Sequence, residues 1–570
     1  MSQSENTLTP PAEVEAAGQH TNARVLAQSA SRWPDRPLLL LDGERLSYAQ
    51  MLAEAERYAA ALLAQGAGPG TRIGILGPNS VEYVKLLYAA GMIGACAITL
   101  NARFKEADLV YALDHAEAGF LFIGGQARSF MDFRAMLVRI YPELQGWDGK
   151  APLSLAAAPH LRRLFNFGDP DETAWPDEAA FLSAATPAHL DQARRLRDEI
   201  PSQSDALIIY SSGTTAHPKA CILSHRNLSQ IGMSFARRFR LGPEDVVYNP
   251  MPFFHMSSML PMAACRAAGA MQICTGHFKP HEALRQMQDE RATFAYVSFP
   301  TIVGGILNDP GFAEADLSSV RLLHCVGPAD LLRRYADSLP GVRFVNAYGL
   351  TEGSGVPVWS DPWDRADDPF THSGKAFDGL EIAAFDPETD RRLPPDTRGE
   401  LRLRGFCRFS GYLKDEAATA QVLRADGWLC TGDLGYVDAG GIVTYDGRLK
   451  DMLKIGGENV AALEIESYLC THPDIELAQV IAVPDGHLFE VAAAYVELRP
   501  GARLTAAEVV DYCLGRIASY KVPRYVRFVT EWPMSTTKIQ KFRLSREFAA
   551  EEYFDIKQMM AARRSACIAG

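Results

Sequence analysis

A loop rich in hydroxyl side chains lies between Tyr210 and Lys219. It follows Ala206-Leu-Ile-Ile209, a short apolar run typical of a buried strand. Hydroxyl donors, backbone N–H groups and one ammonium can converge there, which suits the oxygens of a polyphosphate. The spacing does not fit the Walker A pattern G-x-x-x-x-G-K-[ST], and alone the loop also fits an ordinary Ser/Thr-rich surface turn. The residues expected to bind are Ser211, Ser212, Gly213, Thr214, Thr215 and Lys219.

Four more short motifs follow in the chain: Tyr348-Gly-Leu-Thr-Glu352, Thr431-Gly-Asp433, Gly447-Arg-Leu-Lys-Asp451 and the polar segment around Lys538. Taken singly, each motif has a plainer interpretation: Tyr348 as a core aromatic, Asp433 as a turn residue, Lys538 as one solvated lysine. All five motifs occurring in this order indicate a nucleotide-binding function far more specifically than any single motif does.

On these motifs the chain resembles the adenylate-forming superfamily of acyl-CoA synthetases, peptide-synthetase adenylation domains and luciferases, and is most similar to the fatty-acyl-CoA synthetases. The resemblance runs from roughly Arg45 to Arg543. It implies an ATP-dependent acid–thiol ligase that uses ATP, Mg²⁺ and coenzyme A. Such an enzyme makes an acyl adenylate with release of pyrophosphate, and then an acyl-CoA with release of AMP.

The resemblance also assigns the nucleotide-binding residues. It places the β- and γ-phosphates of ATP on the loop from Ser211 to Lys219. Tyr348 would stack on adenine, and Asp433 and Arg448 would bind the ribose hydroxyls. The full set expected at the nucleoside is Gly327, Pro328, Ala329, Asn346, Ala347, Tyr348, Gly349, Asp433 and Arg448.

Catalytic roles are implied for His255, Thr351, Glu352 and Lys538. Thr351 would contact the α-phosphate, and Glu352 together with Thr214 would hold Mg²⁺, which triphosphate chemistry needs for charge neutralisation. The Lys538 ammonium would reach the α-phosphate and the substrate carboxylate. His255 matches the ring that borders the carboxylate and later opens the way for the thiol, although a lone histidine fits a structural role equally well.

The acyl pocket implied by the resemblance draws on Met256–Leu260, Val297–Val303 and Gly353–Val358, none of which contains Lys, Arg or Asp. We therefore expect an uncharged acyl tail, with a medium-chain fatty acid preferred and a linear, branched or aromatic shape left open. Amino acids are disfavoured because Phe253 and Phe254 precede His255, and a desolvated ammonium without a partner is costly.

Coenzyme A use is implied by Gly456-Gly-Glu-Asn-Val460, whose adjacent glycines, Gly456 and Gly457, let backbone approach a slender pantetheine arm. Three alternatives remain: an aryl- or other-acid-CoA ligase, an acyl-AMP ligase that loads a carrier protein, and a non-catalytic nucleotide-binding regulator. The glycine pair argues against the carrier-loading ligase. The intact Lys219, Glu352, Asp433 and Lys538 argue against the regulator.

Three positions depart from the family pattern. Ala216 and Ala220 stand where glycine is usual in the phosphate loop, and Thr537 stands where glycine usually precedes the catalytic lysine. A β-branched residue resists positive φ, so we expect the loop that presents Lys538 to differ in shape.

The elements that position these motifs predict an α/β protein. A strand at Arg72–Gly77, a helix capped by Asn79 or Ser80 and a strand at Ala95–Leu100 form a βαβ unit, which implies a parallel sheet. Five further strands are predicted after the phosphate loop, at Val246–Asn249, Ala270–Cys274, Phe294–Val297, Leu322–Val326 and Arg343–Asn346. Sites are then expected at the carboxyl ends of the strands. A small antiparallel β unit is predicted from Gly379 to Val443, and a compact α+β region beyond it. In that region a helix from Thr505 is expected to begin with a capping-box pair, Thr505 and Glu508.

We accordingly predict a large N-terminal domain, residues 1–449, and a small mobile C-terminal domain, residues 450–570. Lys450 lies at the junction and is also expected among the cofactor-binding residues. Residues 1–20 are expected to form a flexible lead-in. The proline-rich stretch from Ser129 to Ser202 is expected to be a variable connecting region, helical in places.

The composition narrows the choice of partners and compartment. The net charge is −12 and no long basic run occurs, so nucleic acid is a poor candidate partner. The longest apolar stretch, Met256–Thr275, is interrupted by Pro261 and Arg266, which disfavours an integral membrane segment. The polar start and ten scattered cysteines favour a cytoplasmic protein with reduced thiols. A homodimer is left open.

Overall fold

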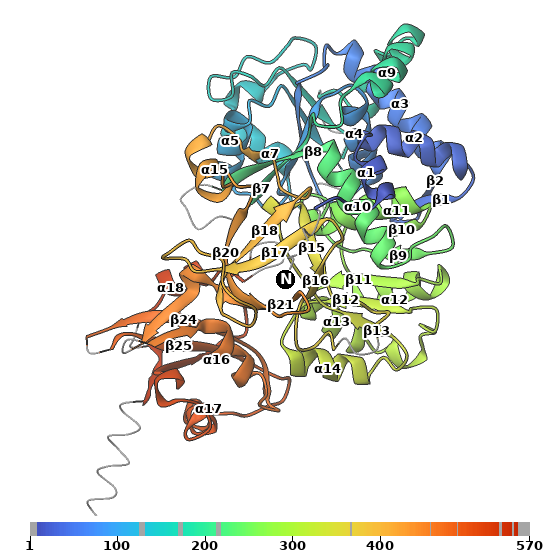
Figure 1. Cartoon of the computed structure of the whole chain (residues 1–570). Helices are drawn as coiled ribbons and strands as arrows, with labels where there is room; N and C mark the ends of the chain where they lie inside the picture. The colour runs from blue at the N-terminus through green and yellow to red at the C-terminus, as the bar shows by residue number, and fades with distance from the viewer. Residues whose placement is uncertain are drawn as a thin grey trace, which may run out of the picture.

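The computed structural model describes residues 8–124, 131–168, 175–211, 218–364, 368–455, 458–486, 488–534, 539–549 and 552–556. In these ranges four β-sheets carry the fold and helices cover them (Figure 1). We call them sheets I to IV. The predicted fold class is confirmed: two sheets are mainly parallel, the third is antiparallel, and the fourth belongs to the C-terminal region.

Sheet I is parallel from β13 to β1, with β2 added antiparallel at its edge. Five of its strands were predicted near the observed positions, whereas the β1–β2 hairpin was not. In spatial order the strands are β13 (Arg343–Val345), β12 (Leu322–Cys325), β11 (Phe294–Ser298), β9 (Val246–Tyr248), β10 (Met271–Cys274), β1 (Pro37–Leu41) and β2 (Glu44–Ser47).

Sheet II contains the predicted βαβ unit at its centre. Its parallel strands end in an antiparallel hairpin, β7–β8, to which the short edge strand β19 is added. In spatial order the strands are β19 (Gly411–Tyr412), β8 (Lys219–Ser224), β7 (Asp205–Ser211), β4 (Cys96–Leu100), β3 (Arg72–Leu76), β5 (Phe120–Ile123) and β6 (Arg163–Asn166).

Helices pack between sheets I and II and on their outer faces. One buried apolar cluster joins the inner faces of both sheets, and two further clusters lie on the outer faces. The inner helices are α2 (Asn22–Arg32), α3 (Tyr48–Ala64), α4 (Val81–Met92), α10 (His225–Arg238) and α11 (Met256–Ala268). The outer helices are α5 (Glu106–His115) and α7 (Phe133–Ile140) on sheet II, and α12 (Pro280–Asp289), α13 (Pro300–Leu307) and α14 (Ala329–Asp337) on sheet I.

The inner helices begin where their sequences provide caps. The Ser80 hydroxyl accepts from the Tyr83 N–H and starts α4, as predicted. Ser47 and Gln50 form a capping box at the start of α3, satisfying two backbone donors that would otherwise lack a partner. These caps fix the ends of the helices that hold β3, β4 and β7 in place.

Sheet III is antiparallel throughout and larger than predicted, because it begins at β14 and includes β15. It lies beside sheets I and II, at the centre of Figure 1. In spatial order its strands are β14 (Ala347–Leu350), β15 (Gly355–Trp359), β16 (Gly374–Ala376), β21 (Ile442–Arg448), β20 (Leu429–Val437), β18 (Gly399–Gly405) and β17 (Leu380–Phe385). Helix α15 (Glu416–Val422) precedes β20.

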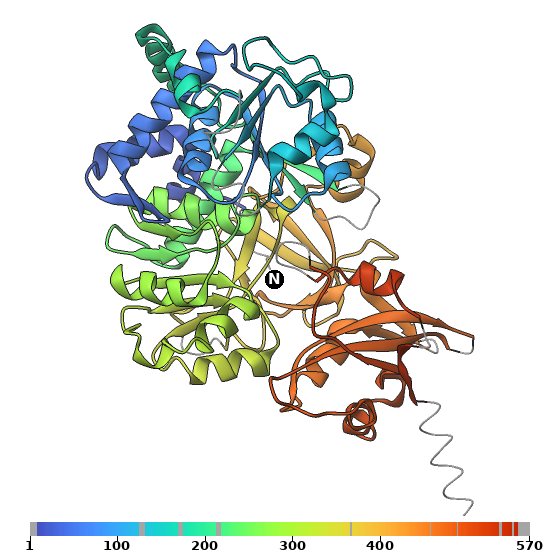
Figure 2. The same cartoon turned by 180° about the vertical axis from the view of Figure 1, so that it is seen from behind.

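Sheet IV forms the C-terminal unit, seen at the lower corner of the molecule in both ribbon views (Figures 1 and 2). Its strands are β22 (Met452–Ile455), β23 (Glu458–Ala461), β24 (Ile475–Asp485), β25 (Phe489–Leu498), β26 (Tyr525–Phe528) and β27 (Phe554–Asp555). Its helices are α16 (Ala462–Leu469), α17 (Ala506–Cys513) and α18 (Lys541–Arg546). Thr505 and Glu508 form the predicted capping box of α17. A single 3₁₀ turn, η5 (Leu449–Asp451), connects β21 of sheet III to β22.

One sequence-based expectation was wrong and a second was incomplete. Residues 12–17 are not a flexible lead-in but a helix, α1 (Ala12–Ala17), held on α10 by ion pairs of Glu15 with Arg226 and of Glu13 with Arg237. The region from 129 to 202 contains a strand as well as helices: β6 extends sheet II, and α8 (Glu178–Ser183) and α9 (Pro187–Glu199) follow it.

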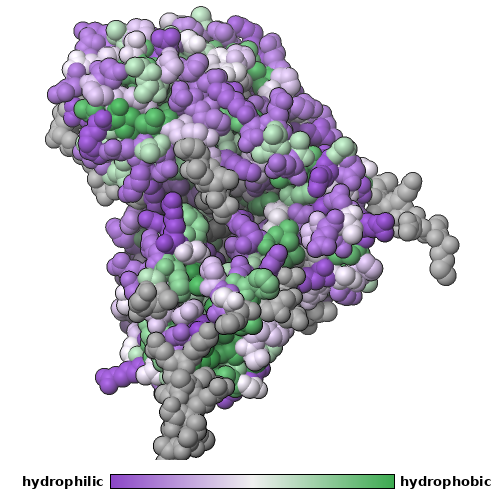
Figure 3. All heavy atoms as spheres, turned by 90° about the vertical axis from the view of Figure 1, so that its left-hand side faces the viewer, coloured by the Kyte–Doolittle hydropathy of each residue, from purple (hydrophilic) through white to green (hydrophobic). Residues whose placement is uncertain are grey.

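The surface differs between the two ends of the chain. Most exposed large hydrophobic side chains of the described residues belong to the C-terminal unit: Leu488, Phe489, Tyr520, Phe528, Met534 and Phe542. The face in Figure 3 is largely hydrophilic, with hydrophobic side chains visible in its lower half. Among the described residues, no helix combines the length and apolar character needed to cross a bilayer.

Candidate active site

The β7–β8 hairpin presents the two ends of the predicted phosphate loop. Ser211 and Lys219 are register partners across the hairpin, and the Ser211 hydroxyl donates to the Lys219 carbonyl at 3.3 Å. Ser212, Gly213, Thr214, Thr215 and Ala216 lie outside the described residues. Ala220 pairs with Tyr210 and is a buried strand residue, so this departure from glycine falls in β8 and not in the turn.

One tyrosine, Tyr412, joins Lys219 to Glu352. The Lys219 ammonium lies 4.6 Å from the centroid of the Tyr412 ring, within the range of a cation–π contact. The Tyr412 hydroxyl donates to Oε1 of Glu352 at 2.7 Å. Burial, followed by the Glu352 charge, raises the pKa of Tyr412, so the hydroxyl remains a donor. The edge strand β19 thus connects the phosphate-loop lysine to the acid expected to hold Mg²⁺.

Thr351 and Glu352 lie in the 3₁₀ turn η4 (Thr351–Gly353), directly after β14. The Glu352 carbonyl accepts from the Phe409 N–H at 2.9 Å, which fixes the turn against the chain that leads into β19. The buried Cys221 of β8 lies near the Glu352 carboxylate. Burial, and then that negative charge, raise the pKa of the Cys221 thiol, so it is a neutral packing residue.

Tyr348, Asp433 and Arg448 form a connected group in sheet III. The Tyr348 hydroxyl donates to Oδ2 of Asp433 at 2.9 Å, and Nε of Arg448 lies 3.2 Å from Oδ1. Asp433 and Arg448 are register partners on β20 and β21. Burial alone would lower the pKa of the Arg448 guanidinium. Asp433 and the other acidic groups around it outweigh that effect and raise the pKa. The buried carboxylate is therefore oriented from two sides, as a ribose-binding residue would need to be.

Tyr445 is a neighbour that the sequence analysis missed. Its ring stacks on that of Tyr348, with centroids 5.6 Å apart and planes at 27°. Tyr445 lies on β21, three residues before Arg448. Strand alternation across a sheet brings such residues together, but no local sequence signal shows which aromatic will meet Tyr348.

The hairpin β14–β15 requires a glycine beside Tyr348. A Cβ at Gly349 would lie 2.0 Å from the Gly355 carbonyl oxygen, so no side chain fits there. Tyr348 is the register partner of Val358. The two strands of one hairpin therefore carry the residue expected at adenine and a stretch expected at the acyl tail.

The remaining residues expected at the nucleoside follow neighbouring strands of sheet I. Gly327, Pro328 and Ala329 come after β12 and begin α14, while Asn346 and Ala347 come after β13. Because His324 and Val345 are register partners, the two segments emerge side by side. The Asn346 side chain donates to the His372 carbonyl at 3.1 Å and accepts from the Ala347 N–H at 2.8 Å, which fixes the connection into β14.

His255 is the N-cap residue of α11, and its ring centroid lies 4.9 Å from that of Phe254. The first turn of α11 packs on β15: a Cβ at Gly355 would come within 3.3 Å of the Met256 side chain. Ser354, next to Gly355, adopts a left-handed φ of 58°, and Ser298, at the end of β11, adopts one of 60°. Such strain in non-glycine residues is concentrated at functional sites.

Of the remaining predicted residues, the structure describes Lys450. Lys450 lies in η5, exposed, between sheets III and IV. Gly456, Gly457, Thr537 and Lys538 lie outside the described residues. The structure thus brings together Ser211, Lys219, Glu352, Tyr348, Asp433 and Arg448, drawn from four of the predicted motifs, and adds Tyr412 and Tyr445.

Comparison with known proteins gives two family matches. Residues 26–413 match a model described as AMP-binding enzyme, and residues 464–538 match one described as AMP-binding enzyme C-terminal domain. The first range contains the loop at 211–219, Tyr348, Glu352 and Tyr412, and the second ends at Lys538.

The similar proteins match this chain over most of its length and over most of their own. YngI of Bacillus subtilis (strain 168), provisionally named an acyl-CoA synthetase, is 32% identical over 541 residues, covering 92% of this chain and 96% of YngI. The human mitochondrial medium-chain acyl-CoA ligase ACSF2 is 30% identical over 546 residues, covering 92% and 88%. Among solved structures, ATP-bound MatB from Rhodopseudomonas palustris superposes with a TM-score of 0.78 at 26% identity, covering 92% and 98%.

Proposed function

The chain belongs to the AMP-binding enzyme family and is an AMP-forming acid–CoA ligase, and on that premise we propose that it activates a medium-chain fatty acid. The uncharged stretches at 256–260, 297–303 and 353–358 support an apolar acyl tail. The similarity to ACSF2, which is named a medium-chain acyl-CoA ligase, supports the chain length. An aryl- or other-acid substrate is the second candidate, since the same uncharged stretches fit a ring.

In the first half-reaction, a carboxylate oxygen of the acid attacks the α-phosphorus of ATP and the bond to pyrophosphate breaks. The loop that ends in Lys219 binds the β- and γ-phosphates, and Lys538 stabilises the charge that develops at the α-phosphate. Glu352 fits a Mg²⁺ site, because it supplies a hard carboxylate oxygen and Tyr412 orients that carboxylate. Bound Mg²⁺ would neutralise triphosphate charge. Thr351 and Thr214 complete the polar contacts.

The nucleoside is held by residues of sheet III and the adjacent end of sheet I. Asp433 and Arg448 bind the ribose hydroxyls, with the carboxylate already fixed by Tyr348 and Arg448. Adenine lies between Tyr348 and the segment Gly327-Pro-Ala329, with Asn346, Ala347 and Gly349 at its edge. The stacked Tyr445 restricts the Tyr348 ring and so reduces the entropy lost on binding.

In the second half-reaction, the coenzyme A sulfur attacks the acyl carbonyl carbon. The bond to the AMP phosphate oxygen breaks, AMP leaves, and the thiol gives up its proton. His255 borders the carbonyl, and Gly456-Gly457 lets the pantetheine arm approach. We propose that residues 450–570 rotate about Lys450 relative to residues 1–449 between the two steps. The single turn η5 between sheets III and IV supports that hinge.

The observation that supports the adenylation step is the Lys219–Tyr412–Glu352 contact beside the Tyr348–Asp433–Arg448 group. It joins the residues proposed for phosphate, metal and ribose from distant parts of the chain. The test is a panel of C4 to C16 fatty acids, benzoates, dicarboxylates and amino acids, with ATP, Mg²⁺ and coenzyme A. AMP release and acyl-CoA formation are measured together.

Each well-buried methylene adds about 0.8 kcal/mol, so kcat/KM should rise about threefold to fourfold per carbon up to an optimum at medium length. A benzoate optimum would favour the second candidate. An amino-acid or dicarboxylate optimum would contradict the pocket assignment. Formation of free acyl-AMP without acyl-CoA would indicate transfer to a carrier protein instead.

A further inference from the structure

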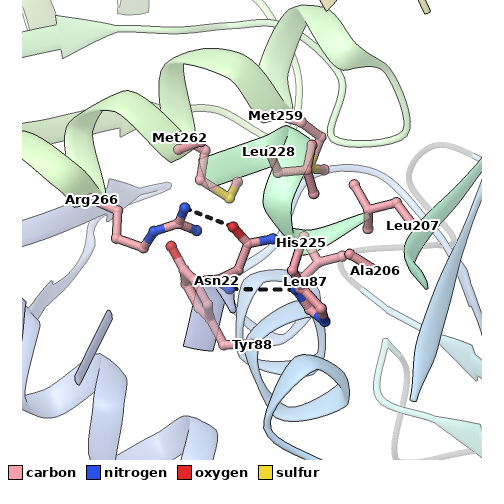
Figure 4. Close-up of a pocket in the computed structure, with 11 residues that line it drawn as sticks. Asn22, Leu87, Tyr88, Ala206, Leu207, His225, Leu228, Met259, Met262 and Arg266 are labelled. Carbon is pink, nitrogen blue, oxygen red and sulfur yellow. Dashed lines mark hydrogen bonds between the residues drawn. The ribbon is translucent and has the colours of Figure 1, made fainter. Parts of the chain in front are cut away.

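A small cavity of about 30 Å³ lies between the inner helices and sheet II. It is bounded by α2, α4, α10 and α11 and by Ala206 and Leu207 near the start of β7 (Figure 4). Ser211 stands at the other end of that strand, so the cavity is distinct from the candidate phosphate site. Its walls are mostly apolar, but four polar side chains line it: Asn22, Tyr88, His225 and Arg266.

Arg266 brings a buried positive charge to this cavity. Its relative exposure is 3%, and its Nη2 donates to Oδ1 of Asn22 at 2.7 Å. Within the part of the chain that the structure describes, its Nε has no hydrogen-bond partner and its guanidinium pairs with no carboxylate. An uncompensated buried charge is strongly unfavourable. The guanidinium lies in the last turn of α11, whose carbonyl dipole offsets only part of it.

Two of the other polar groups at the cavity, the His225 ring and the Tyr88 hydroxyl, are also donors, whereas the Asn22 side-chain oxygen already accepts from Arg266. The Asn22 N–H donates to Nδ1 of His225 at 3.4 Å, which leaves the histidine proton on Nε2. Neither that Nε2 nor the Tyr88 hydroxyl meets an acceptor within the described ranges. Burial, and then the Arg266 charge, lower the pKa of His225 to about 3, so the ring stays neutral. Burial raises the pKa of Tyr88, so its hydroxyl stays protonated.

A group of donors around one cation calls for a negatively charged acceptor. Figure 4 shows the Tyr88 hydroxyl turned toward the Arg266 side chain, and the Arg266 guanidinium carbon lies 5.9 Å from the Tyr88 ring centroid. The volume holds roughly two water-sized species and cannot take an acyl chain. Water would satisfy a donor here but would leave the charge of Arg266 uncompensated.

We propose that this cavity binds one small inorganic anion of halide size, held by the guanidinium of Arg266 and the hydroxyl of Tyr88. The anion would join α4 to α11. Because His255 is the N-cap residue of α11, the site would stabilise the far end of the helix whose first turn packs on β15. This inference stands independently of the acid substrate.

The direct test is a crystal of the full chain grown in sodium bromide, with diffraction collected at the bromine absorption edge. An anomalous peak within hydrogen-bond distance of Arg266 Nε or Tyr88 Oη is expected. In solution, thermal unfolding is followed in sodium chloride and in sodium gluconate at equal ionic strength. The midpoint should be roughly 2 °C higher in about 0.5 M chloride, because an anion that binds only the folded state stabilises it.

Arg266→Gln should remove the difference between chloride and gluconate. The matched control, Arg285→Gln, changes an exposed arginine of α12 and should keep it. If Arg266→Gln fails to fold, the wild-type bromide crystal decides the question alone. An ordered water without anomalous signal at Arg266, or equal midpoints in chloride and gluconate, would overturn the proposal.

Discussion

The Tyr412 hydroxyl donates a 2.7 Å hydrogen bond to Glu352, and the ring of the same tyrosine lies 4.6 Å from the Lys219 ammonium. An edge strand of sheet II thus spans the space between a lysine and a glutamate 133 positions apart. Because Tyr412 contacts both charged groups, it is expected to pre-organise the phosphate and metal side of the site.

Tyr412→Phe should keep the ring beneath Lys219 and lose only the hydrogen bond to Glu352. A hydrogen bond to a charged group contributes about 1.5–3 kcal/mol, so we expect at least a tenfold loss in kcat/KM for Mg-ATP. The loss should also shift the Mg²⁺ concentration that gives half-maximal pyrophosphate exchange. Tyr436→Phe, on β20, is the matched control and should change neither quantity. An unchanged Mg²⁺ dependence in Tyr412→Phe would exclude this positioning role.

Asp433→Asn should weaken ATP binding selectively. The amide replaces a charged acceptor that meets both Tyr348 and Arg448, so the KM for ATP should rise about 10-fold to 100-fold with little change in the KM for the acid. Steady-state kinetics with each substrate varied in turn measures the split. Asp446→Asn, which loses a partly exposed ion pair with Arg398, should change the KM for ATP less than twofold. Equal effects on both substrates would point to misfolding instead.

Lys538→Ala should abolish adenylate formation. Loss of a pre-organised charge donor costs on the order of 10²–10³ in rate, measured by pyrophosphate exchange. Supplied acyl adenylate and coenzyme A should still give thioester, because that step is proposed to use the other domain orientation. Retained exchange at near wild-type rate would mean that the loop with Thr537 works differently here.

The neighbouring Lys541 is a poor control for this experiment. Its ammonium lies 2.5 Å from Oε1 of the buried Glu466, which also accepts from the Val480 N–H at 2.6 Å. Removing Lys541 would leave that carboxylate buried beside one backbone donor and would destabilise the C-terminal unit. Arg546→Ala, an exposed cation on α18, is the better control and should keep full exchange.

Lys450→Pro tests the proposed hinge. Proline fixes φ near −65° and should restrict rotation between sheets III and IV. Pyrophosphate exchange should survive, while conversion of acyl adenylate to acyl-CoA falls sharply. Lys450→Ala separates the loss of the side chain from the loss of backbone freedom and should retain both steps. A parallel loss of both steps in Lys450→Pro would place the hinge elsewhere.

Acidification should destabilise the protein through two buried histidines, His225 and His324. Burial lowers the pKa of His225 to about 3 and of His324 to about 4, while the unfolded value is 6.5. Between these values the unfolded chain binds more protons, so stability falls as the pH falls below 6.5. Each histidine should cost about 2 kcal/mol at pH 5 relative to pH 7.

Urea unfolding at the two pH values measures this cost. His324→Asn keeps a donor for the Val345 carbonyl and should reduce the loss by about 2 kcal/mol. His160→Gln, at an exposed position, should leave the loss unchanged. An identical pH dependence in His324→Asn would show that carboxylates alone cause the loss.

The sequence analysis correctly predicted features that depend on residues close together in the chain. The strand before Ser211, the Ser80 cap and the Thr505–Glu508 capping box depend on neighbours in the chain, and all three are present. The superfamily resemblance and the predicted enzyme class are confirmed by the family matches. The expected roles of the individual site residues and the domain boundary stay predictions.

Features fixed by distant contacts were missed. Strand β6 is recruited by pairing with β5 in a stretch rich in proline, and α1 is held by ion pairs with residues more than 200 positions away. Tyr412 follows the same rule, since its two partners come from β8 and η4. No spacing within residues 408–416 indicates that this tyrosine meets a lysine and a glutamate.

The hairpin β14–β15 has a consequence for laboratory evolution of this protein. Tyr348 pairs directly with Val358, and Gly349 admits no side chain because of Gly355. Libraries that vary residues 355–358 to accept a new acid will therefore also disturb the strand that carries Tyr348. Variants selected for a new acid preference at these positions should bind ATP more weakly than the parent protein. Further improvement in activity on the new acid should then come from residues outside the hairpin, such as Met256 and Val303.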